Sequence, residues 1–192
     1  MAGVQDKTGY FFMEFMPDLQ IQEDLLDYPC KRFDIDKDSI VRVSSEHFTK
    51  CMHYSAYTWY SKRAKKDFPD ISRTEVFKYI AKSTKSTIVT GVKKCDSMQM
   101  QRMLSKAVGT CIYPMENWTL NDVLTFMKER NISIPPLTKK GCRGVGITYN
   151  EIKFIQENYP DDFRRIETVF PFIQALLLSH KYFGIKDTMR IV

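Results

Sequence analysis

The residues whose type and position best suit ligand binding are two lysines that follow a short β-branched run. The run covers residues 87–90 and ends at Gly91, and Lys93 and Lys94 come directly after it. Parallel α/β proteins bind ligands outside the carboxyl ends of their strands, so these lysines are placed to contact an anion. A basic turn without a ligand is the alternative, and the pattern leaves both open.

The residues after the lysines extend this candidate site. Asp96 and Ser97 could hydrogen-bond a ribose or an amide, but such residues beside a glycine turn are also ordinary helix caps. Capping is the role that we expect for them. Arg102 adds a further positive charge a few residues later.

A glycine-rich loop carries a second group of positive charges. Three glycines between residues 139 and 146 make this stretch the most flexible and cationic loop of the chain. We expect its charges to converge with the first group on one patch. The predicted anion- or nucleotide-binding set is Gly91, Lys93, Lys94, Asp96, Ser97, Arg102, Lys139, Lys140 and Arg143.

Cys142 is the one candidate for a reactive thiol. Its basic neighbours predict an exposed, electropositive setting that would lower the pKa of the thiol. No histidine lies nearby in the sequence, and most single cysteines are inert small hydrophobes. We therefore assign no catalytic residue beyond this candidate. The five cysteines include no C-x-x-C pair, which argues against zinc and against a disulfide framework, and indicates a reducing compartment.

Length and charge limit the class of protein. The 192 residues are enough for one core, and a hydrophobic share of 43% excludes a disordered chain. A net charge of +6 favours an anionic partner: a nucleotide, a nucleic acid or an acidic protein. The sequence has no apolar signal core and no run of roughly 20 apolar residues, so we expect a cytoplasmic protein without membrane contact.

Strands are expected to alternate with helices. This order predicts an α/β fold with a parallel sheet covered by helices on both faces and a helical C-terminal segment. We expect one domain, with a core over 1–137 and the glycine loop and C-terminal helices over 138–192. Strands are predicted over 10–16, 39–43 and 87–90, and helices over 21–28, 47–66, 74–82, 119–127, 149–156, 161–169 and 171–183, the first of them closed by Pro29.

The stretch from Tyr54 to Lys66 mixes aromatic and basic residues. This composition could stack bases and neutralise phosphates, it could form a core-facing stripe, or it could serve a protein interface. The sequence does not separate these three uses.

Two motifs carry a family resemblance. Residues 88–97 with Arg102 resemble the strand-Gly-x-Arg-x-x-(Asp/Glu)-Ser motif of the phosphoadenosine phosphosulfate (PAPS) reductase family, with Lys93 in place of the usual Arg. Residues 113–123 resemble its Pro-x-x-x-Trp-(Thr/Ser)-x-x-Asp-Val element. Softer matches extend the resemblance over about residues 9–184 and are similar to phage and prophage members.

The resemblance implies a truncated Rossmann-like fold of the adenine nucleotide alpha-hydrolase-like kind. Family members hold phosphates with a Ser-Gly-Gly-x-Asp-Ser loop, which this sequence lacks, and its first strand resembles the family's second. The family's late catalytic cysteine has no counterpart either. We therefore expect a degenerate, phage-type binding or regulatory module, located in the host cytoplasm if phage-encoded. The alternative is one subunit of a split PAPS reductase or of an adenylyl- or sulfur-transfer enzyme.

Ligands and partners follow from the same resemblance. An adenine nucleotide is the one cofactor that it suggests, and no metal is predicted. A sheet that lacks its first strand has an exposed edge, which a homodimer or a protein partner would cover. Nucleic acid remains a further candidate because of the positive charge.

Overall fold

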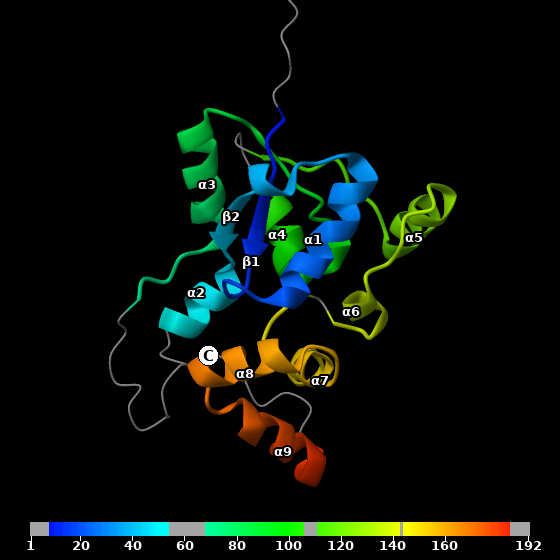
Figure 1. Ribbon diagram of the computed structural model, residues 1–192. Coiled ribbons are helices and arrows are strands. Elements are labelled where there is room, and N and C mark those ends of the chain that lie inside the picture. The colour runs from blue at the N-terminus through cyan, green and yellow to red at the C-terminus, as the bar shows by residue number, and fades with distance from the viewer. Residues whose placement is uncertain (1–7, 54–67, 106–110, 143, 185–192) are drawn as a thin grey trace, which may run out of the picture. The chain divides into compact units, whose positions relative to one another are not determined.

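The computed structural model describes residues 8–53, 68–105, 111–142 and 144–184 (Figure 1). The chain forms two compact units. The first unit consists of residues 1–71 and 135–192, and the second of residues 72–134. The expected single domain with a boundary near residue 137 stays a prediction. Across the described ranges, no helix is both long and apolar enough to cross a lipid bilayer.

The first unit begins with a parallel strand pair. Strand β1 (Phe11–Glu14) pairs with β2 (Val41–Ser44), and the register places Phe11 opposite Val41 and Glu14 opposite Ser44. The connection runs through helix α1 (Gln20–Phe33) and the 3₁₀ turn η1 (Lys37–Ser39). Both strands were predicted, β1 from an apolar and aromatic run and β2 from alternating apolar residues, and this prediction is confirmed.

Helix α1 is longer than the sequence predicts because it continues through Pro29 to Phe33. Proline cannot donate to the preceding turn and costs about 3 kcal/mol inside a helix. Leu26, before the proline, and Cys30, after it, are both buried, and the apolar burial of the helix offsets that cost. The helix ends instead at Asp34, which has a φ of 53° and donates its N–H to Cys30.

The remaining helices of this unit follow β2 and the second unit. Helix α2 covers Glu46–His53, where the helix predicted over 47–66 begins, and residues 54–67 lie outside the described ranges. The three predicted C-terminal helices are confirmed. They are α7 (Tyr149–Asn158), α8 (Pro160–Val169) and α9 (Ile173–Phe183), preceded by the short α6 (Pro136–Lys139).

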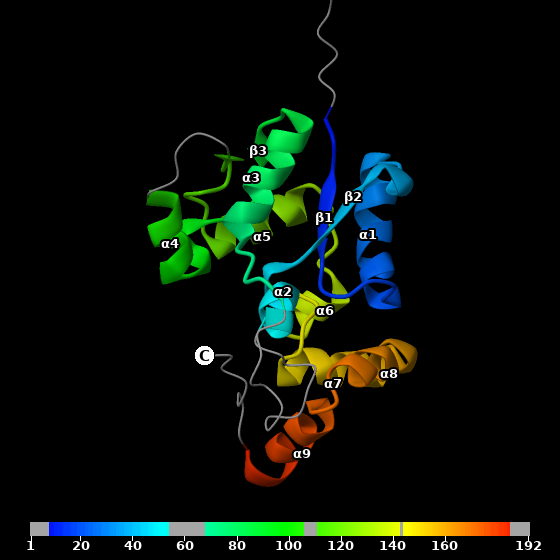
Figure 2. The same cartoon turned by 90° about the vertical axis from the view of Figure 1, so that its left-hand side faces the viewer.

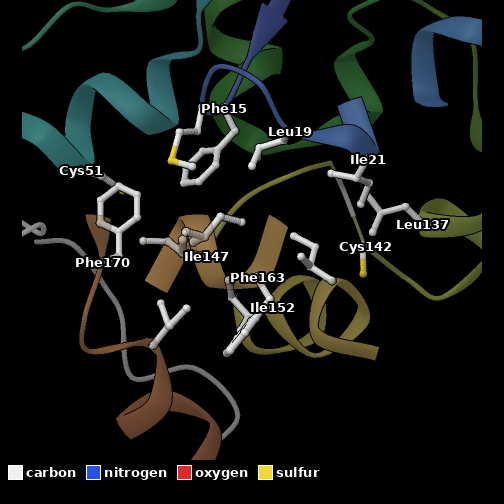
Figure 3. Close-up of a cluster of buried hydrophobic side chains, with 14 residues drawn as sticks. Phe15, Leu19, Ile21, Cys51, Leu137, Cys142, Ile147, Ile152, Phe163 and Phe170 are labelled. Atoms are coloured by element: carbon white, nitrogen blue, oxygen red, sulfur yellow. The ribbon is translucent and has the colours of Figure 1, made fainter. Parts of the chain in front are cut away.

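The core of the first unit lies beyond the carboxyl end of β1, where Figures 1 and 2 show α7 and α8. Phe15 follows β1 directly, is 2% exposed, and packs against Phe170 with ring centroids 5.9 Å apart. Figure 3 shows apolar side chains from the β1–α1 turn meeting those of the C-terminal helices. The fully buried members include Leu19, Ile21, Ile147, Ile152, Ile155, Ile166 and Ile173.

The second unit contains another parallel strand pair. Strand β3 (Ile88–Val89) pairs with β4 (Cys111–Ile112), and helices α3 (Arg73–Thr84), α4 (Met98–Ser105) and α5 (Leu120–Glu129) accompany them, with a 3₁₀ turn η3 at Lys94–Asp96. Helices α3 and α5 and strand β3 were predicted, whereas β4 was not. Strand β3 lies in a β-branched run of four residues that ends at Gly91, whereas no such run marks β4. The α/β class with parallel strands is confirmed, and the described strands form two separate pairs.

Candidate anion-binding site

The first group of predicted residues lies in the second unit, directly after β3. The ladder continues one residue past the strand because Thr90 donates its N–H to Ile112. A Cβ on Gly91 would lie 3.6 Å from the sulfur of Met115, which is ordinary contact. Steric crowding therefore does not require glycine at this position.

Lys93 forms a local ion pair with Asp96. The ammonium Nζ lies 2.8 Å from Oδ1, and the backbone N–H of Lys93 donates to Oδ2 at 3.0 Å. Burial raises the pKa of Asp96, but the hydrogen bonds from Lys93 outweigh it and hold this pKa below its usual value. The positive charge of Lys93 is thus already compensated within the turn.

Lys94 is held by the segment that leads to α5. Its Nζ lies 3.2 Å from Oε1 of Glu116 and donates to Oδ1 of Asn117 at 2.9 Å. Its backbone N–H donates to the carbonyl of Glu116 at 2.8 Å. The two sequence motifs therefore contact each other here, and the contact neutralises the second lysine.

The other residues of this group have structural roles at helix ends. The hydroxyl of Ser97 accepts a hydrogen bond from the N–H of Met100 at the start of α4, which is the capping role expected of it. Arg102 lies exposed on α4. Lys93 and Lys94 are paired with Asp96 and Glu116, so these two lysines leave little net positive charge on this surface.

Trp118 and Asp122 have architectural roles at the start of α5. Thr119 and Asp122 form a reciprocal capping box at the start of α5, with hydrogen bonds of 3.2 Å and 2.7 Å. The ring of Trp118 meets that of Phe126 edge to face, with centroids 5.5 Å apart. These contacts fix the segment that holds Lys94.

The second group of predicted residues belongs to the first unit. Lys139 ends α6, and Lys140 follows it in a turn in which Gly141 has a φ of 79°. Arg143 lies outside the described residues. Since the two basic groups belong to different units, their convergence on one patch stays a prediction.

The exposed setting expected for Cys142 was wrong. The residue is 5% exposed and packs in the apolar core of the first unit, as Figure 3 shows. Burial raises the pKa of its thiol, and the nearby negative charge of Glu151 raises it further. The basic neighbours along the sequence do not decide this environment, because the side chain turns inward. Cys142 therefore has the features of an inert buried thiol.

A buried carboxylate that the sequence motifs did not reveal lies at the start of α1. Asp162 of α8 is 2% exposed and accepts hydrogen bonds from the backbone N–H groups of Gln20 at 2.9 Å and Ile21 at 2.8 Å. A helix N-terminus is a ready anion-binding site, and here a side chain of the same chain occupies it. The apolar spacing of α8 does not indicate that Asp162 caps α1, because only the tertiary contact between the two helices shows it.

The backbone of the adjoining turn, between β1 and α1, is also hydrogen-bonded within the protein. Gln22, which is 1% exposed, accepts a hydrogen bond from the N–H of Phe15 and donates one to the carbonyl of Met16, both at 2.6 Å. The amide thus satisfies the backbone just beyond β1. The backbone N–H of Phe15 and the carbonyl of Met16 are therefore already hydrogen-bonded within the protein.

His47 and Glu151 meet around Gly146 in the same unit. A Cβ on Gly146 would lie 2.7 Å from Oε2 of Glu151 and 3.0 Å from Nδ1 of His47. Burial lowers the pKa of His47, and the charge of Glu151 opposes this effect. Glu151 also accepts the N–H of Thr148 at 3.1 Å. Within the described ranges, no group of three or more potential ligands is placed to hold a metal ion.

Parallel strand pairs joined through helices, with ligand-binding candidates directly after a strand, define an α/β chain of truncated Rossmann-like organisation. The family model of the phosphoadenosine phosphosulfate reductase domain matches residues 23–151. The chain belongs to this family, as its motifs indicated. No curated protein and no solved structure is significantly similar to it.

Proposed function

We propose that this PAPS-reductase-like chain is a catalytically inactive, phage-type binding or regulatory module that acts through a protein partner. One observation carries the proposal: the carboxyl end of the β1–β2 pair is filled from within. Asp162 occupies the amides at the start of α1, and Phe15 and Leu19 pack against the C-terminal helices.

The pairing of the candidate lysines supports the same conclusion. Lys93 and Lys94 already have carboxylate partners, so an anion must compete with Asp96 and Glu116. The sequence also contains no Ser-Gly-Gly-x-Asp-Ser loop to hold phosphates. An adenine nucleotide would therefore bind weakly at most.

The experiment is to assay the purified chain for pyrophosphate release from ATP and for PAPS reduction, beside an active PAPS reductase as the positive control. We expect no turnover above the blank. Turnover by the pure chain that Lys93→Ala abolishes would overturn the proposal.

A second candidate function is a subunit of a split enzyme whose phosphate loop comes from another chain. It is favoured by the β1–β2 sheet, which has two strands among the described residues and could be extended by a strand supplied in trans. Mixing the chain with a protein that carries Ser-Gly-Gly-x-Asp-Ser tests this. Pyrophosphate release that appears only in the mixture would favour the split enzyme, and no release would leave the binding module as the function.

A further inference from the structure

An open hollow lies beside the turn between β1 and α1. It has a volume of about 530 Å³ and is lined by Met16, Pro17, Asp18, Arg165, Thr168 and Val169. The turn contributes the first three residues and α8 the last three, so the hollow lies entirely within the first unit. The lysines of the candidate anion site, Lys93 and Lys94, belong to the second unit.

The hollow combines an apolar lining with one oriented cation. Met16, Pro17 and Val169 supply apolar surface. The guanidinium of Arg165 donates a hydrogen bond to the backbone carbonyl of Asp18, which fixes it at the rim. An arginine that is already oriented loses less conformational freedom when a carboxylate binds.

The charges of α8 show which group is available. Arg164 is paired with Asp161 on its own helix. Among the residues that the structure describes, no carboxylate forms an ion pair with Arg165. Arg165 is also exposed, so a ligand can reach its free donors. The carboxylate of Asp18 lines the same hollow, so it repels a polyanion such as ATP more strongly than a ligand with a single carboxylate.

We propose that this hollow docks an apolar, carboxylate-bearing segment of a partner protein. The apolar side chain of the partner would lie on Met16 and Val169, and its carboxylate would accept a forked hydrogen bond from Arg165. The net charge of +6 complements an acidic partner. This proposal rests on the proposed function, because it specifies the chemistry of the protein partner through which the chain would act.

The test uses the full chain and two small probes, N-acetyl-leucine and N-acetyl-leucinamide, which differ only in the carboxylate. Titrations followed by nuclear magnetic resonance would read the Met16 methyl group and the Thr168 amide. We expect the acid to bind about fivefold more tightly than the amide. Arg165→Gln should remove this difference, Arg165→Lys should keep part of it, and the matched control Arg164→Gln should leave it unchanged.

Equal binding of the two probes, no shift at Met16 and Thr168, or an equal loss in the Arg164→Gln control would overturn the proposal. Tighter binding of ATP than of N-acetyl-leucine at the same residues would also overturn it, because it would show a polyanion site. Failure of the proposed function looks different: ATP turnover by the pure chain would refute that function without changing the probe titrations.

Discussion

The carboxylate of Asp162 accepts a 2.8 Å hydrogen bond from the backbone N–H of Ile21, which lies 141 residues earlier in the chain. Leu19, at the N-cap position of α1, has no side-chain group that can cap the helix. A residue of α8 therefore performs the capping, and its negative charge also complements the dipole of α1.

Asp162→Ala should lower the free energy of unfolding by about 2 to 4 kcal/mol, because it leaves two backbone N–H groups without their charged acceptor. Asp162→Asn should cost less, since one acceptor oxygen remains. Urea unfolding measures both. The control is Asp161→Ala, an exposed neighbour that pairs with Arg164, and equal losses for the two alanine variants would contradict the capping role.

Gly146→Ala should destabilise the chain by about 1 to 3 kcal/mol through overpacking against Glu151 and His47. Gly144 is the matched control, because a Cβ there would meet nothing within 4 Å. Thermal unfolding of the two variants should therefore separate them clearly. Similar melting temperatures would show that the Glu151 and His47 side chains move aside at little cost.

The ion pair of Glu23 and Arg42 should make stability depend on pH in the acidic range. Hydrogen bonding from Arg42, opposed by burial and helped by Lys37, lowers the pKa of Glu23 from 4.5 to about 2. The lowered pKa means that this stabilisation is complete above pH 4.5 and is lost as the pH falls towards 2. After allowance for solvent screening, we expect roughly 1 to 2 kcal/mol.

The measurement is the unfolding free energy between pH 2 and 5, a window set by that pKa shift, for the wild type and Glu23→Gln. The variant should show a flatter pH dependence. Glu157→Gln serves as the control, since Glu157 is exposed and lies 4.0 Å from Lys153. An unchanged slope in Glu23→Gln would refute the assignment.

Cys95 should react with a thiol reagent before Cys142 does. Cys95 is exposed, whereas Cys142 is buried and burial raises its pKa. At mildly alkaline pH, Cys95→Ser should remove a fast phase of disulfide exchange, and Cys142→Ser should affect only a slow phase that requires unfolding. Fast modification of Cys142 in the folded protein would instead support the hypothesis of a reactive thiol that its sequence neighbours suggested.

Replacing both Lys93 and Lys94 by Ala should weaken the binding of ATP or sulfate and make it less sensitive to salt. The stability change should be within about 1 kcal/mol, since the lysines are in ion pairs near the surface. Calorimetric titrations at two salt concentrations provide the measurement. Lys78→Ala with Lys82→Ala, both exposed on α3, is the matched control, and equal affinity in the two double variants would exclude an anion site at the lysines.

The strands and the C-terminal helices were predictable because their signals are local. Apolar runs ending at turn residues marked β1 and β3, and helical spacing marked α7, α8 and α9. The end of α1 was predicted too early, before Pro29, because the burial of Leu26 and Cys30 depends on tertiary contacts. Strand β4 was missed because no β-branched run like the one around β3 marks it in the sequence.

The site was less predictable than the fold. Motif spacing located Lys93 and Lys94, but their partners Asp96 and Glu116 are recognised only from the folded turn. Basic neighbours suggested an exposed Cys142, and its side chain instead joins the core. No sequence pattern identified Asp162 as a helix cap, because the N–H of Ile21 that donates to it lies 141 residues earlier in the chain.

The capping of α1 by Asp162 also sets an order of events during protein synthesis. Residues 1–71 leave the ribosome early, yet the core that they share with α7, α8 and α9 needs the last part of the chain. Residues 72–134 emerge in between and contain all of the second unit. The nascent N-terminal segment must therefore wait, with its apolar turn exposed, until α8 has been translated, and this interval is when a chaperone would have its opportunity to bind.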